Sequence, residues 1–598
     1  MEASPAPPSD GVRIVDSTLA SAGVGRWVVV GRDRAAEPTW DADRDLLFAG
    51  DVRLYNRPEL AASLDVRQPL DAVSDLELAR LAYLKWGYDS PRFLVGDFAF
   101  AAWSDRERAL FAARDQFGMR PLYYSSLADG FVVASHVCQI LALVDRPTDR
   151  VSAHQVLDLF TLQTSDPKRS FFEGIKRVRP GHHLIARMGR IDEARYWRPQ
   201  VEPDHSTSYA DNCELLRTAF RRAVRDRLES DHPIVAHSSG GFDSSTILVA
   251  ADDVYRAERE RPPLVMASAT APGFEADESH YMDAVAARVS FEGIRWNVVD
   301  STPVAFPGLR PSGPVLRTGM AGGGCRDLTI AHERGARVLI SGFLGDDVWY
   351  AAGVLRDFVR HGQLLPVFRY LRRAGLGWSG LRPLFYAGLG LLPPPIAVVV
   401  ADKLQRRKFN PGPPGWMGPA LQALYPPDPE PIDPPPLVGQ SHLSCGLWSV
   451  FTHPRREAAI EAMIDYGVQD GIEVRLPYAD VRLLECVLRI PWEQRDPRGH
   501  HRRTGRDALG PLLPPEFAAR NEQSSWTPVW DATARRTLIS LAPFIRQGPW
   551  ASAAFVDRGI ARGRLESLLA NGADADYLTL LLVLQIGALE AWLRTLLL

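Results

Sequence analysis

Short apolar runs separated by polar turns fill the first 200 residues of the chain. The clearest runs have the length of β-strands and lie at residues 26–30, 46–48, 98–103, 109–113 and 131–135. Residues 75–87 differ, because Leu76, Ala79 and Tyr83 are spaced to share one face of a helix. The pattern predicts an α+β domain, rich in antiparallel sheet, over residues 1–200.

A different pattern begins near residue 206, where predicted helices alternate with short apolar strands. The predicted helices are 215–228 and 246–259, and the predicted strands are 234–236, 264–268 and 338–340. Strands joined in this way by helices form parallel sheets. Helical periodicity dominates after Arg455, so residues 206–598 are predicted to form an α/β domain with a helical C-terminus.

One segment of this second half departs from the alternation. Residues 354–441 are rich in proline, arginine and leucine, and irregular structure is expected at 411–414 and 426–436. We interpret the segment as an insertion or a mobile covering element.

Two apolar stretches approach the length of a membrane span. In 383–401, the run Pro393-Pro394-Pro395 would break a helix, so we predict core packing, with peripheral contact to a membrane or a peptide as the alternative. The stretch 577–598 is interrupted by Gln585, Glu590 and Arg594. Charged side chains insert into a bilayer only at a cost. We therefore predict a buried C-terminal helix and no membrane span.

The composition narrows the class of protein. A chain of 598 residues exceeds one ordinary core, and 46% hydrophobic and 24% charged residues are typical of soluble globular proteins. The net charge of −3 provides no basic field, so nucleic acid is not an expected partner. The five cysteines are scattered without metal-ligand spacing, and no signal peptide is apparent. We expect reduced thiols and a cytoplasmic location.

A glycine- and serine-rich turn, Ser239-Gly240-Gly241-Phe242-Asp243-Ser244-Ser245, follows the predicted strand 234–236. Between a strand and a helix, such a turn brings backbone N–H groups close to phosphate oxygens. The donors are the backbone at Gly240 and Gly241 and the hydroxyls of Ser239, Ser244 and Ser245. Asp243 would repel bare phosphates, so its expected role is to hold Mg²⁺. The turn is not a Walker A loop, since no Gly-Lys-Ser/Thr follows. We predict an ATP pyrophosphate-binding loop (PP-loop), with a simple helix cap as the alternative.

A second turn, Ser341-Gly342-Phe343-Leu344-Gly345-Asp346-Asp347, follows the predicted strand 338–340. Ligands of parallel sheets bind at the carboxyl ends of strands. Ser341 and Gly342 are therefore predicted to contact ATP, and Asp346 to be a second Mg²⁺ ligand. Taken alone, an Asp-Asp turn is usually a solvated helix cap.

Further motifs resemble the asparagine synthetase family over nearly the whole chain. Those of its glutaminase domain are Phe48-Ala49-Gly50-Asp51, Ser74-Asp75-Leu76-Glu77, Gly96-Asp97-Phe98-Ala99-Phe100, Ala113-Arg114-Asp115-Gln116-Phe117-Gly118, Pro121-Leu122-Tyr123-Tyr124, Phe172-Glu173-Gly174-Ile175 and Pro180-Gly181-His182. The two turns and Gly471-Ile472-Glu473-Val474-Arg475-Leu476-Pro477-Tyr478 resemble its synthetase domain. The resemblance implies a glutaminase-like sandwich of N-terminal-nucleophile (Ntn) type in 1–200 and an adenylating PP-loop ATP pyrophosphatase domain in 206–598.

Two departures from the family imply that the first domain no longer releases ammonia. The family's glutaminase uses an N-terminal cysteine, whereas Glu2 follows Met1 here and the first cysteine is Cys138. Ala49-Gly50 also replaces the family's Asn-Gly, which removes an oxyanion donor.

Phe343 is the departure that bears on the nucleophile. Asparagine synthetases have a similar turn with a glutamate at that position. β-Lactam synthetases have a similar turn with a tyrosine, which helps remove a proton. Phenylalanine accepts no proton, which favours an α-amine, with a pKa of about 8, as nucleophile. This favours the lasso peptide cyclase branch. The resemblance implies adenylation of an Asp or Glu side chain in a ribosomal precursor peptide and macrolactam closure by the peptide's α-amine. A leader peptidase and a leader-recognition protein are then the expected partners.

A third departure concerns the leaving pyrophosphate. Gln523 stands where the family's synthetases carry a charge-stabilising lysine, and Arg520, Arg502 and Arg503 are the candidates to replace it. Glu473 is the candidate to orient or deprotonate the amine, with a structural ion pair to Arg475 as the alternative.

Other functions stay open at the level of sequence. One is an ammonia-dependent asparagine synthetase or another small-molecule amide synthetase, such as a β-lactam-type enzyme. Another is a non-catalytic peptide-binding homologue with a decayed site. A tRNA-modifying relative is disfavoured by the near-neutral charge.

Overall fold

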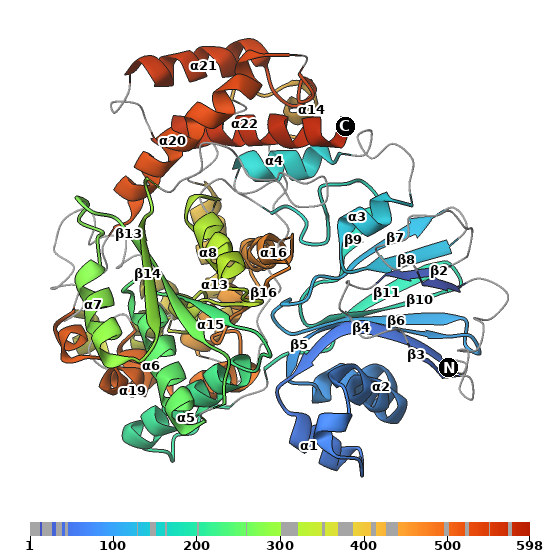
Figure 1. The fold of residues 1–598 in the computed structure, drawn as a ribbon, viewed down its shortest axis with the longest axis vertical. Coiled ribbons are helices and arrows are strands. Elements are labelled where there is room, and N and C mark those ends of the chain that lie inside the picture. The colour runs from blue at the N-terminus through green and yellow to red at the C-terminus, as the bar shows by residue number, and fades with distance from the viewer. Residues whose placement is uncertain are drawn as a thin grey trace.

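The architecture is taken from a computed structural model of the chain (Figure 1). It describes residues 12–14, 27–30, 39–41, 46–127, 130–143, 151–161, 164–199, 202–258, 260–300, 321–349, 353–368, 387–407, 414–425, 441–469, 471–495, 502–520, 525–548, 550–571 and 577–597.

Two stacked sheets form the N-terminal half (Figure 1). The five-stranded sheet has the order β1-β2-β8-β7-β9, with strands Val12–Ile14, Trp27–Val30, Gly130–Ala134, Tyr123–Leu127 and Ile175–Arg177. The six-stranded sheet has the order β11-β10-β6-β5-β4-β3, with strands Arg190–Arg195, His182–Arg187, Ala109–Arg114, Gly96–Ser104, Leu46–Leu54 and Thr39–Asp41. Only β1, β2 and β8 pair in parallel among these strands. The predicted strands and the mainly antiparallel pairing are confirmed.

Strand β5 shows why this half forms a layered core. Phe98 and Phe100 pack with residues of helices α1 (Arg57–Ser63) and α2 (Asp75–Trp86), whereas Ala101 and Trp103 pack with residues of the five-stranded sheet. Successive side chains of a strand point to opposite faces. Because both faces of β5 are covered, its sequence is apolar throughout instead of alternating.

A five-stranded parallel sheet of order β14-β13-β12-β15-β16 organises the second half. Its strands are Glu292–Asn297, Leu264–Thr270, Ile234–His237, Val338–Ile340 and Glu473–Arg475. The predicted alternation of strand and helix is confirmed by α5 (Tyr209–Arg227), α6 (Phe242–Ala257), α7 (Ser279–Arg288) and α8 (Ala321–Glu333). Ala236 of β12 pairs with Ile340 of β15, so these two neighbouring strands end side by side.

The proline-rich segment is helical over much of its described length, which the sequence pattern did not predict. Its elements are α10 (Val354–Arg360), a 3₁₀ turn (Leu389–Leu391), α13 (Pro394–Arg407) and α14 (Pro419–Gln422). Helix α13 begins inside the triple-proline run, because a first helical turn has no need of the N–H that proline lacks. The predicted irregular stretches at 411–413 and 426–436 lie outside the described residues.

Helices α20 (Thr527–Arg546), α21 (Arg558–Asn571) and α22 (Tyr577–Leu597) close the chain. They share one apolar cluster with α4 (Ala153–Thr161) and with part of the five-stranded sheet (Figure 1). Gln585 of α22 donates to the Leu159 carbonyl at 3.2 Å, and Glu590 accepts two backbone N–H bonds at Ala551 and Ser552. The predicted buried C-terminal helix is confirmed. In the described part of the chain, the helices are too short or too polar to cross a membrane.

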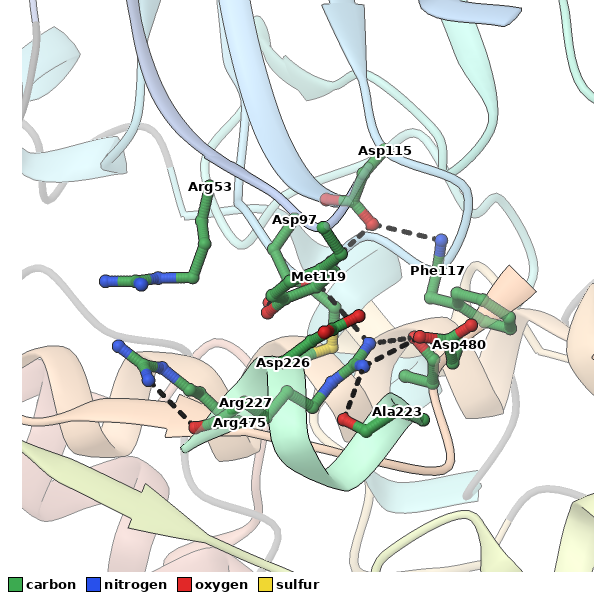
Figure 2. Close-up of polar contacts among 12 residues, drawn as sticks. Arg53, Asp97, Asp115, Phe117, Met119, Ala223, Asp226, Arg227, Arg475 and Asp480 are labelled. Atoms are coloured by element: carbon green, nitrogen blue, oxygen red, sulfur yellow. Dashed lines mark hydrogen bonds and ion pairs between the residues drawn. The ribbon is translucent and has the colours of Figure 1, made fainter. Parts of the chain in front are cut away.

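A buried charged cluster joins the two halves (Figure 2). Arg227 of α5 has 1% of its side chain exposed and lies 2.9 Å from Asp480 and 4.0 Å from Asp97 of β5. Its guanidinium also lies 4.4 Å from the ring centre of Tyr55, whose hydroxyl donates to Asp97 at 2.7 Å. The N-terminal sandwich is therefore fixed to the parallel sheet through groups that depend on one another for charge balance.

Buried His442, at the start of α15 (His442–Phe451), makes one contribution to stability depend on pH. Burial lowers its pKa to about 4, against about 6.5 for an unperturbed imidazole. The unfolded chain therefore binds a proton that the folded chain rejects, so this contribution is present above about pH 6.5 and is lost as the pH falls towards 4. The loss approaches about 3 kcal/mol.

Urea unfolding of the wild type and of His442→Phe at pH 7.5 and pH 4.5 tests this expectation. The wild type should lose more stability on acidification than the variant, because phenylalanine takes up no proton. Asp357, which accepts the His442 backbone N–H at 2.7 Å, titrates in both proteins and largely cancels in the comparison. Equal losses in both proteins would assign the acid sensitivity to other groups.

Candidate active site

The glycine-rich turn and the first turn of α6 form one continuous structure. Helix α6 begins at Phe242, earlier than the predicted start at 246, and Gly241 is its N-cap residue in an extended conformation. Asp243, Ser244 and Ser245 therefore belong to the helix. The first N–H groups of a helix have no partner within it and bind anions well. The helix start was placed too late because its first turn carries polar residues that face the site instead of the core.

Hydrogen bonds within the turn set its shape. The Ser239 and Ser244 hydroxyls lie 3.0 Å apart, and the Gly241 N–H donates to the Ser239 hydroxyl at 3.3 Å. Gly240 has a φ of +72°, and a Cβ there would lie 2.7 Å from the backbone oxygen of Glu278. Glycine is therefore required at this position for both conformation and space.

The second turn lies directly against the first. A Cβ on Gly342 would come within 3.0 Å of the Ser244 backbone nitrogen, and one on Gly345 within 2.3 Å of the Asp243 carboxyl carbon. Helix α9 (Gly345–Val348) starts at this contact. The two glycines let the turns following β15 and β12 touch, as expected for neighbouring strands that end together.

The two predicted metal ligands, Asp243 and Asp346, are brought together around one arginine. Arg502, just before α19 (Arg503–Leu509), pairs with Asp346 and places its Nη1 3.4 Å from the Asp243 carboxylate. Asp243 also accepts a hydrogen bond from the Trp349 indole at 3.2 Å. Burial raises the pKa of Asp243 to about 6, and Arg502 opposes that rise. Asp346 is more than half exposed, so the pair spans from the interior to solvent.

The donor set of this pair suits Mg²⁺. Carboxylate oxygens are preferred ligands of this ion, which usually takes one or two of them and completes its shell with phosphate oxygens and water. Asp243 and Asp346 already share a cationic partner in Arg502. Among the described residues there is no cluster of three His, Cys, Asp or Glu side chains able to hold a metal alone.

Arg520 lies behind the first turn, and its structural partners are defined. Its side chain is 8% exposed, it pairs with Glu278, and its Nη1 donates to the Gly240 carbonyl at 2.6 Å. Arg503 instead pairs with Asp507 at 2.6 Å, within its own helix. Arg502 and Arg520 thus contact the loop residues, and Arg503 does not contact them among the described interactions. Gln523 lies outside the described residues.

Glu473 is not brought to the site, which corrects its predicted role. It begins β16 opposite Val338, at the amino edge of the sheet, whereas both turns leave the carboxyl edge. It pairs with Arg475 at 2.6 Å, with Arg53 at 3.1 Å and with Arg120. Burial opposes its ionisation, but Arg120, Arg475 and Arg53 hold the pKa of Glu473 well below its ordinary value. Such a carboxylate is a poor base, and the ion pair with Arg475 is what the structure shows.

Phe343 lies beside a cation. Its half-buried ring packs against the main core, and the Arg456 guanidinium lies 5.5 Å from the ring centre. Arg456 in turn pairs with Asp347 at 2.6 Å.

Three residues beside the turns were not predicted from the sequence: Glu278 and Trp349, described above, and Tyr281, whose ring centre lies 4.5 Å from the Arg520 guanidinium. Glu278 could have been predicted from the sequence, because it follows the carboxyl end of β13. That strand lies beside β12, which leads into the first turn. Trp349 could not have been predicted, since its contact with Asp243 depends on how α9 packs.

Comparison with known proteins places these features in context. The glutamine amidotransferase domain model matches residues 8–197, and the asparagine synthase model matches residues 215–305 and 466–594. Asparagine synthetase [glutamine-hydrolyzing] 3 of Bacillus subtilis is 34% identical over 35% of this chain and 34% of its own length. Amidase chyE of Penicillium rubens is 29% identical over 37% of this chain and 33% of its own length.

The chain spans about a third of the length of these curated relatives. Among solved structures, the allosteric regulatory enzyme of purine biosynthesis matches 51% of this chain and 70% of its own at 14% identity. Its TM-score of 0.21 supports no structural argument.

Fold and site together define a two-part protein: a layered N-terminal half of two sheets, which the glutamine amidotransferase model matches, and a parallel α/β second half that has a candidate nucleotide site. Over its matched segments the chain is similar to asparagine synthetases.

Proposed function

We propose that the protein is an ATP-dependent amide ligase that activates a carboxylate as its acyl-adenylate. One observation carries the proposal. The two turns that follow β12 and β15 touch, and this contact brings Asp243 and Asp346 to a single cation, Arg502. A glycine turn at a helix N-terminus facing two metal-binding carboxylates is an arrangement suited to the phosphates of ATP with Mg²⁺.

In the proposed reaction, a carboxylate oxygen attacks the α-phosphorus of ATP and pyrophosphate leaves. An amine then attacks the acyl carbon, its surplus proton passes to solvent, and AMP leaves. Mg²⁺ held by Asp243 and Asp346 would neutralise phosphate charge. Arg502 is the candidate cation for the leaving pyrophosphate, because it alone of the three predicted arginines contacts both carboxylates in the described structure.

We propose a lasso peptide cyclase as the specific activity. The carboxylate would be an Asp or Glu side chain of a ribosomal precursor peptide, and the nucleophile its own N-terminal α-amine. Phe343 supports this choice, since an α-amine needs less help to lose a proton than most nucleophiles. Oriented groups on one peptide also react with effective concentrations on the order of 10⁵ M or more. A leader peptidase and a leader-recognition protein would supply the processed substrate, and a cytoplasmic location would suit both.

Residues of the N-terminal half support a role for this half other than the supply of ammonia. Ala49, at the position where the family has an oxyanion-donating asparagine, is buried in β4 and offers only a methyl group. The domain's contacts with the ligase half through Arg227 and Glu473 instead suggest that it acts as a fixed structural partner.

Mass spectrometry of a reaction with Mg²⁺, ATP and a candidate precursor peptide tests the proposal. The expected product is the peptide minus one water, together with equimolar AMP and pyrophosphate. A peptide whose acceptor Asp or Glu is replaced by Asn or Gln is the matched control and should stay linear. An unchanged native peptide in the presence of active ATP turnover would refute the cyclase assignment.

A small-molecule amide synthetase is the second candidate, supported by the asparagine synthetases of Bacillus subtilis among the relatives. The same assay with aspartate and ammonia should then yield asparagine. Peptide binding without pyrophosphate release from any carboxylate would instead indicate a non-catalytic homologue.

A further inference from the structure

A buried ion pair lies behind the glycine-rich turn and has no role in the reaction as written above. Glu278, which precedes α7, has 5% of its side chain exposed, and its partner Arg520 has 8%. The two residues are separated by 242 positions in the sequence. Burying two charges is costly unless the pair is well bonded. The contacts that this pair makes with the turn therefore indicate its role.

The pair holds a backbone carbonyl of the phosphate loop. Arg520 Nη1 donates to the Gly240 oxygen at 2.6 Å, while Nη2 pairs with Glu278. The Gly240–Gly241 peptide is planar and trans, so its C=O and N–H point in opposite directions. Fixing the carbonyl towards Arg520 therefore turns the Gly241 N–H away from Arg520. That N–H donates to the Ser239 hydroxyl, on the other side of the loop.

The guanidinium is itself fixed on several sides. It lies 4.5 Å from the ring centre of Tyr281, and that ring packs 4.8 Å from the ring of Phe517. The backbone oxygen of Glu278 lies 2.7 Å from where a Cβ of Gly240 would be, so Glu278 packs directly against the turn that Arg520 bonds. An arginine with a buried carboxylate, a carbonyl and a ring as partners is suited to hold a fixed geometry.

We propose that Glu278 is a positioning residue for the phosphate loop. It acts through Arg520, which fixes the orientation of the Gly240–Gly241 peptide and so holds the Gly241 N–H on the side away from Arg520, where it donates to Ser239. This inference rests on the proposed ATP site. It also reassigns Arg520 from a contact of pyrophosphate to a support of the backbone that binds it.

Glu278→Gln is the informative variant, because it keeps the shape and removes only the charge that holds Arg520. If Glu278 positions the loop, calorimetry should show Mg²⁺–ATP binding weakened by about tenfold. Hydrogen–deuterium exchange in the 238–242 region of the nucleotide-free protein should become faster. If Arg520 instead contacts the phosphates directly, loss of its counter-charge should leave ATP binding unchanged or make it tighter. That result would overturn the proposal.

Two further variants separate positioning from general destabilisation. Glu278→Asp keeps the charge and should restore part of the affinity. Glu461→Gln is the matched control, because Glu461 is also 5% exposed and pairs with Arg177 at 3.1 Å, in a contact between α16 (Pro454–Gln469) and β9. It should leave ATP binding and exchange at 238–242 unchanged. Equal losses in Glu278→Gln and Glu461→Gln would show a structural effect only and refute positioning.

Failure of this inference is distinguishable from failure of the proposed function. A wild-type protein that binds Mg²⁺–ATP but joins no carboxylate to any amine would refute the ligase, and the calorimetric comparison would still decide the role of Glu278. If the wild type bound no ATP, the exchange experiment would still decide whether Glu278 fixes the loop.

Discussion

Asp243→Asn should lower ATP-dependent pyrophosphate release by a factor of about 10² or more. Asparagine keeps the size of the side chain and an oxygen for the Trp349 indole, which donates to Asp243 at 3.2 Å. It lacks the negative charge that Arg502 contacts at 3.4 Å and that a metal ion would need. A coupled pyrophosphate assay at saturating ATP measures the effect, and circular dichroism confirms that the fold is intact.

Asp346→Asn should show a loss in the same assay, because Asp346 is the other carboxylate paired with Arg502. Asp283→Asn is the control. Asp283 also pairs with an arginine, Arg295, at 2.7 Å, but on the exposed face of α7, and its replacement should leave pyrophosphate release unchanged. Wild-type turnover in Asp243→Asn would eliminate the metal assignment.

Arg227→Met should lower the free energy of unfolding by about 3–5 kcal/mol. The side chain is 1% exposed and bonds Asp480 at 2.9 Å (Figure 2). Its guanidinium lies over the ring of Tyr55. Methionine retains much of the volume but leaves Asp97 and Asp480 with less positive charge nearby. Guanidinium chloride unfolding measures the difference, and Arg222→Met, at a half-exposed position of the same helix, should change stability by less than about 0.5 kcal/mol.

The same variant should also change the dependence of stability on acid. Burial opposes the ionisation of Asp480, but Arg482 and Arg227 together hold its pKa below the ordinary value. This contribution is therefore present above about pH 4 and is lost as the pH falls below that. With Arg227 removed, the acid-induced loss should be smaller. Parallel stability profiles for the wild type and Arg227→Met would exclude this coupling.

The fold was predictable from the chain in part. The apolar runs at 98–103 and 338–340 gave strands in the expected sheets, because burial of a strand on both faces leaves a continuous apolar signal. The start of α6 was predicted too late, at 246, because its first turn is polar. Helices in the proline-rich segment were not predicted either, because composition does not show that α13 begins within a proline run.

The candidate site was predictable only in part. The turns at 239–245 and 341–347 could be singled out as phosphate-binding candidates, because such loops depend on a short local sequence. The position of Glu473 relative to the site could not be predicted. Its closeness to Arg475 in the sequence does not show which edge of the sheet it occupies. Glu278 and Arg520 could not be paired, because 242 residues separate them.

By itself, the sequence determined the more continuously apolar strands, the helices at 75–87 and 215–228 and the position of the two turns, since these depend on periodicity and on contiguous residues. Only the tertiary structure decided that Asp243 and Asp346 meet at Arg502, that Arg520 supports the loop, and that Glu473 belongs to the contact between the halves. The physical reason is that an ion pair depends on distance in space and on burial, and the order of β12, β15 and β16 in the sheet sets both.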